Sequence, residues 1–464
     1  MIDTLETAVA IPALSLAIDS GNVLHVSYYV SGTGEHRYGT WEAGSWTSEL
    51  VAPGGTGSIA VTPSGEPSIA YVALDTLRLA ERTPQGWMSE VADSLHAASG
   101  LPAIGLRSDG RPHLTYVEGF DWTSQYVRHA TRAVSGWADE RLSMGRVEAD
   151  EGGDLSIGSD DFPQAAFHEL YTSEKSRLVV TTFDGASWGR ETVDSAGYGT
   201  TLHEGIQLDL DAANRPHVAY LKLECDFESC VISARYAFRN ESGTWTKLGI
   251  ETVFSAWYTN ENNWMQMRDV AVDPAGTAHC LYLKGIDSTG VQGESLFVAH
   301  RAGSTWVKEC VFLDDAWDAA LQIAPDGTFY VLLSRPAPAY GLYLARRVEL
   351  TDVAGGPRPT GQLRLAVSPN PMRRGGTLSF ALDGGGSSGS SGASGSTGAP
   401  SPAATISIYD IRGRAMRSFE TAAPFGALSW DGADASGRPL APGVYFIRLN
   451  DGGRGATTRV TIVK

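Results

Sequence analysis

The segment "SDGRPHLTY" (108–116) brings four reactive types of side chain together within a few residues. Asp109, Arg111, His113 and Tyr116 supply a carboxylate, a guanidinium, an imidazole and a phenol. An imidazole held by a carboxylate is the usual arrangement for moving a proton in catalysis. Whether the segment is an active-site fragment depends on the elements that would position it.

The segment is one copy of an internal repeat, the first feature to search for in a long chain. Each copy has an aromatic or apolar anchor residue in its second predicted strand, and successive anchors lie about 43 to 62 residues apart. The seven anchors are Tyr28, Tyr71, Tyr116, Phe167, Tyr220, Tyr282 and Leu333.

Each copy predicts four short strands. An apolar first strand leads through a Gly/Asp/Asn turn into the anchor strand, and a third strand such as "LRLAERT" follows. A Gly-x-Trp turn and a fourth strand close the copy; the six tryptophans are Trp46, Trp87, Trp137, Trp188, Trp245 and Trp306. Four strands per repeat at this length are typical of a propeller blade. We therefore predict an all-β chain with a seven-bladed β-propeller over residues 1–350.

The seventh copy ends after its third strand, and the missing fourth strand is predicted at the other end of the chain. "TLETAVAI" (4–11) is similar to the fourth strand "GIETVFS" (249–255). We expect residues 4–11 to complete the last blade, which would close the ring and pair two strand edges.

The repeat changes the interpretation of His113. His25, His217 and His279 occupy the same position in other copies, each just after a tight turn. One polar side chain per blade is a structural position, and we expect it to satisfy backbone groups near the turn. Tyr116 is expected to be a core anchor, so the segment is scaffold.

The candidate ligand site is therefore placed on the opposite face of the predicted disk. The connections between second and third strands, and those between blades, are long and rich in aromatic and amide side chains, and function usually resides in such loops. Aromatic faces stack on sugar rings, while carboxylates and amides bind paired hydroxyls. The predicted ligand-binding residues are Trp122, Trp257, Tyr258, Asn260, Trp264, Trp317 and Tyr340. The alternative is that several of these aromatic residues only cover blade edges.

Catalysis has weaker support in the sequence. Glycoside hydrolysis needs two carboxylates about 5 Å or 6.5–9.5 Å apart, and the candidates are Asp121, Asp314 and Asp315, with Glu118 and Asp318 as further partners. Metal, nucleotide and nucleophile-elbow motifs are absent from the sequence. We expect a binding protein rather than an enzyme, with no cofactor and no metal; a carbohydrate-active hydrolase or lyase using acids on the same face, and a non-catalytic scaffold, remain alternatives.

The charge and the cysteines of the chain limit which classes of partner and which cellular compartment we expect. The 464 residues carry a formal charge of −17, which opposes binding to nucleic acid. Apolar runs stay below the roughly 18 residues that span a bilayer, so no transmembrane segment is expected. Cys225 and Cys230 enclose a short polar loop that a disulfide could close, which suits an oxidising compartment; free thiols are the alternative.

The last third of the chain predicts a second domain. Residues 351–362 are a Pro/Gly-rich linker, and residues 363–464 alternate short strands with turns, as in a small Ig-like β-sandwich. A flexible Gly/Ser insert is expected at 383–402. The phrases "SPNP" (368–371), "IYDIRGR" (408–414) and "WDGADASGRPLAPGVYFIRL" (430–449) occur in order.

Two resemblances follow from these motifs. The C-terminal phrases resemble the Ig-like family of flagellar hook-capping proteins and type IX secretion (type A) sorting domains. The blades, with "G-x-P-H-V-A-Y", "G-x-W" and "E-x-V", resemble bacterial extracellular propellers. The first resemblance implies export by the type IX secretion machinery and an extracellular or outer-membrane-surface location, with the signal peptide absent from this chain. The expected protein is a monomer whose partner is a glycan or a surface protein.

Overall fold

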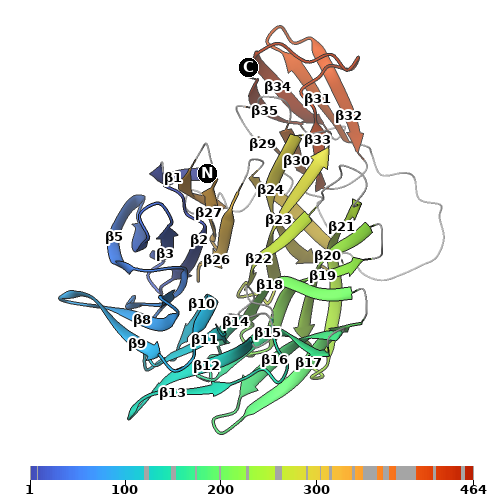
Figure 1. Ribbon diagram of the computed structural model, residues 1–464. Helices are drawn as coiled ribbons and strands as arrows, with labels where there is room; N and C mark the ends of the chain where they lie inside the picture. The colour runs from blue at the N-terminus through green and yellow to red at the C-terminus, as the bar shows by residue number, and fades with distance from the viewer. Residues whose placement is uncertain are drawn as a thin grey trace, which may run out of the picture. The chain divides into compact units, whose positions relative to one another are not determined.

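The computed structural model forms two compact units, residues Met1–Leu350 and Thr351–Lys464, each considered by itself (Figure 1). The regular elements of the described residues are all strands. In the part of the chain that is described, no helix is long and apolar enough to span a membrane. The structure describes residues 2–7, 9–119, 125–147, 153–172, 175–197, 200–225, 229–256, 264–288, 291–303, 305–312, 316–336, 340–347, 363–368, 372, 376–382, 404–421, 425–450 and 455–462.

The first unit consists of seven antiparallel sheets of four strands each, which we number as blades in chain order. Blades 1 to 3 are β2 (Ala13–Ile18), β3 (Leu24–Val30), β4 (Glu35–Glu42) and β5 (Ser45–Pro53); β6 (Gly57–Val61), β7 (Pro67–Ala73), β8 (Thr76–Thr83) and β9 (Gly86–Asp93); and β10 (Ala98–Leu106), β11 (Pro112–Glu118), β12 (Tyr126–Ala133) and β13 (Gly136–Arg141).

Blades 4 to 6 follow the same order of strands. They are β14 (Asp154–Ile157), β15 (Pro163–Thr172), β16 (Lys175–Phe183) and β17 (Trp188–Ala196); β18 (Thr200–Leu210), β19 (Pro216–Cys225), β20 (Ser229–Arg239) and β21 (Trp245–Ala256); and β22 (Trp264–Val272), β23 (Ala278–Ser288), β24 (Val291–Ala302) and β25 (Thr305–Phe312). Blade 7 is β26 (Asp318–Ile323), β27 (Phe329–Arg335), β28 (Gly341–Arg347) and, from the chain start, β1 (Ile2–Thr7).

The seven sheets form a closed ring. The first strand of each blade contacts the first strand of the next, and β26 of blade 7 contacts β2 of blade 1 (Figure 1). The second strands are buried on both faces because each sheet is covered by its two neighbours; the anchors Tyr28, Tyr116 and Tyr282 are at most 1 % exposed. The predicted all-β fold with a seven-bladed propeller is confirmed.

The closing strand lies slightly earlier than the sequence pattern suggested. β1 ends at Thr7 rather than at residue 11, and it pairs antiparallel with β28 from Ile2↔Ala345 to Thr7↔Gly341. Ile11 is fully buried in a core cluster with residues of blades 1 and 7 instead of continuing the ladder. The first part of the segment 4–11 thus belongs to a strand, and its last residue fills the core between blades 1 and 7.

Indole–carboxylate hydrogen bonds join neighbouring blades at the outer strands. In blades 1 to 4 the third residue after the tryptophan is a glutamate, and that glutamate accepts the indole N–H of the next blade's tryptophan. The pairs are Trp87–Glu49 (2.9 Å), Trp137–Glu90 (3.1 Å), Trp188–Glu140 (2.8 Å) and Trp245–Glu191 (2.8 Å). The repeated Gly-x-Trp and E-x-V motifs are therefore the two halves of a contact between blades.

The repeated histidines do not satisfy the backbone, contrary to the expectation from sequence. Nδ1 of His113 lies 2.9 Å from Nε2 of His129 on the third strand of the same blade, and Nδ1 of His25 lies 2.7 Å from the hydroxyl of Tyr38. The backbone at the turn is instead closed by its own residues, with the Gly110 N–H donating to the Arg107 carbonyl and Gly110 at φ +80°. The position remains structural, but its partners are side chains.

The second unit is a small β-sandwich of two sheets. Trp430 is fully buried in its core together with Ile406, Ile447 and Val460. One sheet has the order β29 (Leu363–Ser368), β30 (Gly376–Leu382), β33 (Phe425–Trp430); the other has β32 (Ala415–Thr421), β31 (Ala404–Asp410), β34 (Gly443–Asn450), β35 (Gly455–Ile462). The predicted linker and the predicted insert 383–402 lie outside the described residues.

Candidate functional site

The propeller has two unlike faces, which we name by their connections. The turn face carries the tight turns between first and second strands and between third and fourth strands. The loop face carries the connections between second and third strands and those between blades. Asp318 begins β26 directly after a connection between blades, so the first residues of β26 lie at the loop face.

Three of the predicted ligand-binding residues are described. Trp317 and Tyr340 both belong to blade 7 at the loop face and are 38 % and 37 % exposed. Trp264 is partly buried, and it packs on a core cluster shared by blades 6 and 7. Its indole also fills the space over Gly285, where a Cβ would lie 2.2 Å from the ring nitrogen. Trp264 thus covers a blade edge, whereas Trp317 and Tyr340 are available to a ligand.

The other predicted site residues lie outside the described part of the chain. They are Trp122, Trp257, Tyr258 and Asn260 among the ligand-binding candidates, and Asp121, Asp314 and Asp315 among the weak catalytic ones.

A polar cavity of about 280 Å³ lies along the first strands of the blades, in the central channel. Four carboxylates and one guanidinium line it: Asp154, Asp209, Asp269, Asp318 and Arg268. Asp154 and Asp269 lie two residues closer to the loop face than Asp209. Asp209 pairs with His217, whereas Asp154 and Asp269 pair with Ala166 and Leu281, which lie two residues beyond the position equivalent to His217.

Each channel carboxylate bridges two blades. Oδ2 of Asp209 accepts the N–H of Val272 in the next blade at 2.7 Å, while Oδ1 accepts the N–H of Leu210 at 2.8 Å. Asp154, Asp269 and Asp318 bind the backbone of their own and the next blade in the same way. Because both oxygens already accept backbone donors, these acids replace the ladder hydrogen bonds that the separated first strands cannot make.

Burial governs the protonation of these acids. Burial raises the pKa of Asp154 to about 6 and that of Asp209 to about 7, where the neighbouring Asp154 and Asp211 add repulsion. The pKa of Asp269 is raised well above its usual value for the same reasons. A carboxyl that takes up a proton near neutral pH carries less charge into the channel.

Arg268 distinguishes the channel end nearest the loop face. It occupies a bulge in β22, between Met267 and Asp269 in the pairing register. Its guanidinium lies 3.2 Å from Oδ1 of Asp318 and donates to the carbonyl of Trp317 at 2.7 Å. Burial raises the pKa of Asp318, and the Arg268 charge opposes that rise. The backbone of Trp317 is thereby held beside an ion pair at the channel mouth.

Of the acids suggested by the sequence for a catalytic pair, only Glu118 and Asp318 are described. Glu118 ends β11 in blade 3 and accepts a hydrogen bond from Arg128 at 2.7 Å, whereas Asp318 lies in blade 7 against Arg268. Each described acid of the channel accepts two backbone N–H groups, which accounts for its position by the structure of the ring.

A second polar cluster joins blades 2 and 3 near the outer strands. Nδ1 of His96 lies 2.9 Å from Oδ2 of Asp93 and 3.6 Å from Oδ2 of Asp139, a grouping that could hold a metal ion. The same oxygens already bind protein groups, however: Oδ2 of Asp93 accepts the hydroxyl of Tyr116, and Oδ2 of Asp139 accepts Arg128. The cluster is therefore explained as an ion-pair network between blades.

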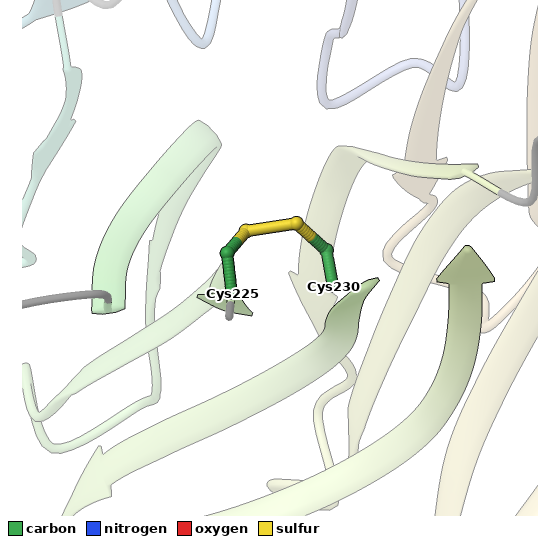
Figure 2. Close-up of a disulfide and its surroundings, with 2 residues drawn as sticks. All are labelled: Cys225 and Cys230. Carbon is green, nitrogen blue, oxygen red and sulfur yellow. A yellow bond between two sulfur atoms is a disulfide. The ribbon is translucent and has the colours of Figure 1, made fainter. Parts of the chain in front are cut away.

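The structure contains a disulfide between Cys225 and Cys230 (Figure 2). It joins the end of β19 to the start of β20 at the loop face, where the two residues face each other in the strand register. Cys280 is buried and Cys310 is partly buried, and both are free thiols. Burial raises the pKa of Cys310 to about 11.

Comparison with known proteins gives the fold and no family. No family model matches the chain, and no curated protein matches it in sequence. Among solved structures, the chain is similar to an ulvan lyase of a polysaccharide lyase family, with 11 % identity over 74 % of this chain and 94 % of that one and a TM-score of 0.51. It is also similar to a fungal alcohol oxidase solved in complex with copper, with 9 % identity over 100 % and 99 % of the two chains and a TM-score of 0.50. A fungal fucose-recognising lectin with a six-bladed propeller aligns at 13 % identity over 72 % and 100 %, with a TM-score of 0.38. At these identities, the two matches with the higher TM-scores show that the chain shares their fold.

Proposed function

We propose that the protein binds a glycan at the loop face of its propeller, around the mouth of the central channel. The observation that carries this proposal is the pair of exposed aromatic residues of blade 7 at the loop face, Trp317 and Tyr340, the first of which precedes the Asp318 of the Arg268–Asp318 ion pair. Loops on a rigid scaffold are where binding residues are concentrated, and aromatic side chains supply large contact surfaces. Here they provide flat apolar faces for sugar rings next to charged groups that bind hydroxyls.

Binding is proposed rather than catalysis because the contacts of the channel acids are explained by the ring itself. The carboxylates of Asp154, Asp209 and Asp269 each accept backbone N–H groups from two blades. The shared fold with a polysaccharide lyase does not choose between the two activities, since propellers support many functions.

We further propose that the protein works outside the cell and that the C-terminal sandwich serves type IX export or anchoring. The disulfide between Cys225 and Cys230 supports an oxidising compartment. The C-terminal motifs, which lie in a separately folded sandwich, support the second part of the proposal.

The test is a glycan array probed with the full chain, followed by titration calorimetry with the strongest hit. Trp317→Ala and Tyr340→Ala are each expected to weaken binding at least about tenfold, since stacking on an aromatic ring is worth on the order of 1.4 kcal/mol. Met88→Ala, which removes an exposed apolar side chain from the outer strand β9, is the matched control and should leave affinity unchanged.

Two outcomes would count against this function. An array without any signal from protein whose folding is verified would remove the glycan proposal. Release of shortened or unsaturated products from a bound polysaccharide would replace binding with the lyase or hydrolase alternative.

A further inference from the structure

The contact between blades 5 and 6 departs from the pattern of the other outer contacts. The third residue after the tryptophan is Glu49, Glu90, Glu140, Glu191 and Glu309 in blades 1, 2, 3, 4 and 6, but it is Leu248 in blade 5. Leu248 pairs with Tyr236 as Glu49 pairs with Tyr38, so the two positions are equivalent in the sheets. A carboxylate is therefore replaced by an apolar side chain at one place in the ring.

The replacement changes the environment of one arginine. In blades 2, 3 and 5 the residue opposite the tryptophan is an arginine that binds the glutamate of the preceding blade; for example, Arg82 contacts Glu49 at 2.8 Å, and Arg239 contacts Glu191 at 2.8 Å. Blades 1 and 4 have an aromatic residue there instead. Arg301 holds this position in blade 6. Its Nε donates to the Gly303 carbonyl at 3.0 Å, and no carboxylate among the described residues lies within ion-pair distance of it.

Arg301 lines a cavity of about 540 Å³ on the turn face. The cavity lies between the turns of blades 5 and 6, and its volume falls within the range of pockets that bind small molecules. The guanidinium lies over the ring of Phe238, 5.2 Å from the centroid. Phe238 in turn stacks on Tyr236 and His217, with ring centroids 5.6 Å and 5.9 Å away. The arginine is thus held on an aromatic base, with its donors toward the cavity.

The other charges of the cavity are already matched. Arg215 donates to Asp211 at 2.7 Å and lies 3.6 Å from the exposed Glu241. Burial alone would raise the pKa of Asp211, but hydrogen bonds from the Arg215 backbone and side chain bring it below its usual value, so Asp211 is ionised. Burial lowers the pKa of His217, which is therefore neutral at pH 7. Arg301 is the cation left for a ligand.

We propose that this cavity is a second binding site, which takes a sugar acid: a hydroxylated ring bearing one carboxylate, of monosaccharide to disaccharide size. The carboxylate would bind the Arg301 guanidinium, a pairing that guanidinium geometry favours. The Glu241 carboxylate and Ser242 hydroxyl at the rim would bind ring hydroxyls. This site is separate from the proposed glycan site at the loop face and does not depend on it.

The test is titration calorimetry of the full chain with D-galacturonic acid and D-glucuronic acid, with galacturonic acid methyl ester and D-galactose as uncharged probes. The acids are expected to bind, to bind at least about tenfold more tightly than the uncharged probes, and to weaken as salt is added. Arg301→Gln should abolish this preference. Leu248→Glu should do the same by supplying Arg301 with the carboxylate found in the other blades.

Controls separate this site from fold and from the loop face. Arg82→Gln removes the equivalent arginine between blades 1 and 2, and it should leave uronate binding unchanged, as should Trp317→Ala at the loop face. Thermal unfolding of each variant verifies folding; should Leu248→Glu not fold, Arg301→Gln alone decides. Absence of uronate binding, equal binding of acid and ester, or unchanged binding in folded Arg301→Gln would each overturn the proposal.

Discussion

The hydroxyl of Tyr28 donates a hydrogen bond to Oε1 of Glu6 across 2.9 Å, and this contact joins the first blade to the last. The same oxygen accepts the indole N–H of Trp46 at 3.3 Å and the hydroxyl of Ser48 at 2.9 Å. Elsewhere in the ring these donors are divided between two acids: Tyr220 binds Asp194, while Trp245 binds Glu191. The Glu6 carboxylate therefore accepts all three of these side-chain donors of blade 1.

Glu6→Ala is expected to lower the free energy of unfolding by about 2–3 kcal/mol, because the buried Tyr28 hydroxyl loses a charged acceptor. Burial raises the pKa of Tyr28 to about 12, so the phenol stays protonated and needs a partner throughout the usual pH range. Urea unfolding monitored by tryptophan fluorescence measures the change. Glu42→Ala, at an exposed position in β4, is the control; equal stability of the two variants would contradict the role of Glu6.

Asp209→Asn should change how stability depends on pH. With a folded-state pKa of about 7 against an ordinary value of 3.8, the folded protein binds a proton that the unfolded chain does not between about pH 4 and pH 7. Stability from this group is thus complete below about pH 4 and declines as pH rises to about 7. The variant cannot ionise, so it should gain on the wild type by about 4 kcal/mol over this interval.

Urea unfolding at pH 4.5, 6.0 and 7.5 compares the two proteins, and only the difference between them is used because other groups also titrate. Glu66→Gln at an exposed turn controls for the loss of one charge. Parallel pH curves for the wild type and Asp209→Asn would mean that the channel carboxyl is ionised throughout.

The thiol chemistry of the chain follows from burial. Denatured, unreduced protein should show two reactive thiols from Cys280 and Cys310, and reduction should raise the number to four. In the native protein both free thiols should react slowly with a thiol reagent at pH 8, since burial raises the pKa of each. Thiol titration before and after denaturation measures this, and four thiols without reduction would contradict the disulfide.

His113 should behave as a neutral core residue. Burial, with the nearby His129 and arginines, lowers its pKa to about 3, so its ring resonances should not titrate between pH 5 and pH 8 in an NMR experiment. His113→Gln should cost about 1 kcal/mol of stability, as for one hydrogen bond, and leave glycan binding unchanged. A ring that protonates near pH 6.5, or a folded variant that loses ligand, would contradict this assignment.

Most of the fold could be predicted from the sequence because each blade repeats the same burial pattern. The anchors from Tyr28 to Tyr282 and the six tryptophans recur at matching positions, so that errors in one copy are corrected by the others. Strand β1 was recognisable because "ET" precedes an apolar residue both at Glu6 and at Glu251, and both glutamates accept an anchor tyrosine. Its exact end was not, since the apolar residues after Thr7 suit a strand and a core equally well.

The channel carboxylates could not be assigned from the sequence. A repeat alignment places Asp154 and Asp209 at different levels, and it does not show that neighbouring first strands are far enough apart for a carboxylate to bridge them. The available signal was a charged residue inside an otherwise apolar first strand, as in "QLDL" (207–210). The sequence also shows Leu248 as the exception to the Trp-x-x-Glu pattern. Its consequence follows only from the structure, which places Arg301 at the position that binds this glutamate in other blades.

Completion of the last blade by β1 also sets an order of events during synthesis. The residues that pair β1 with β28 lie more than 300 positions apart in the chain, and so do Leu14 and Asp318, which join the first strands of blades 1 and 7. During synthesis, β1 therefore cannot pair until β28 has been made. Blades 1 to 6 can each form earlier from local hairpins. Ring closure is consequently the contact of highest sequence separation, and we expect it to be the final and slowest step of propeller folding.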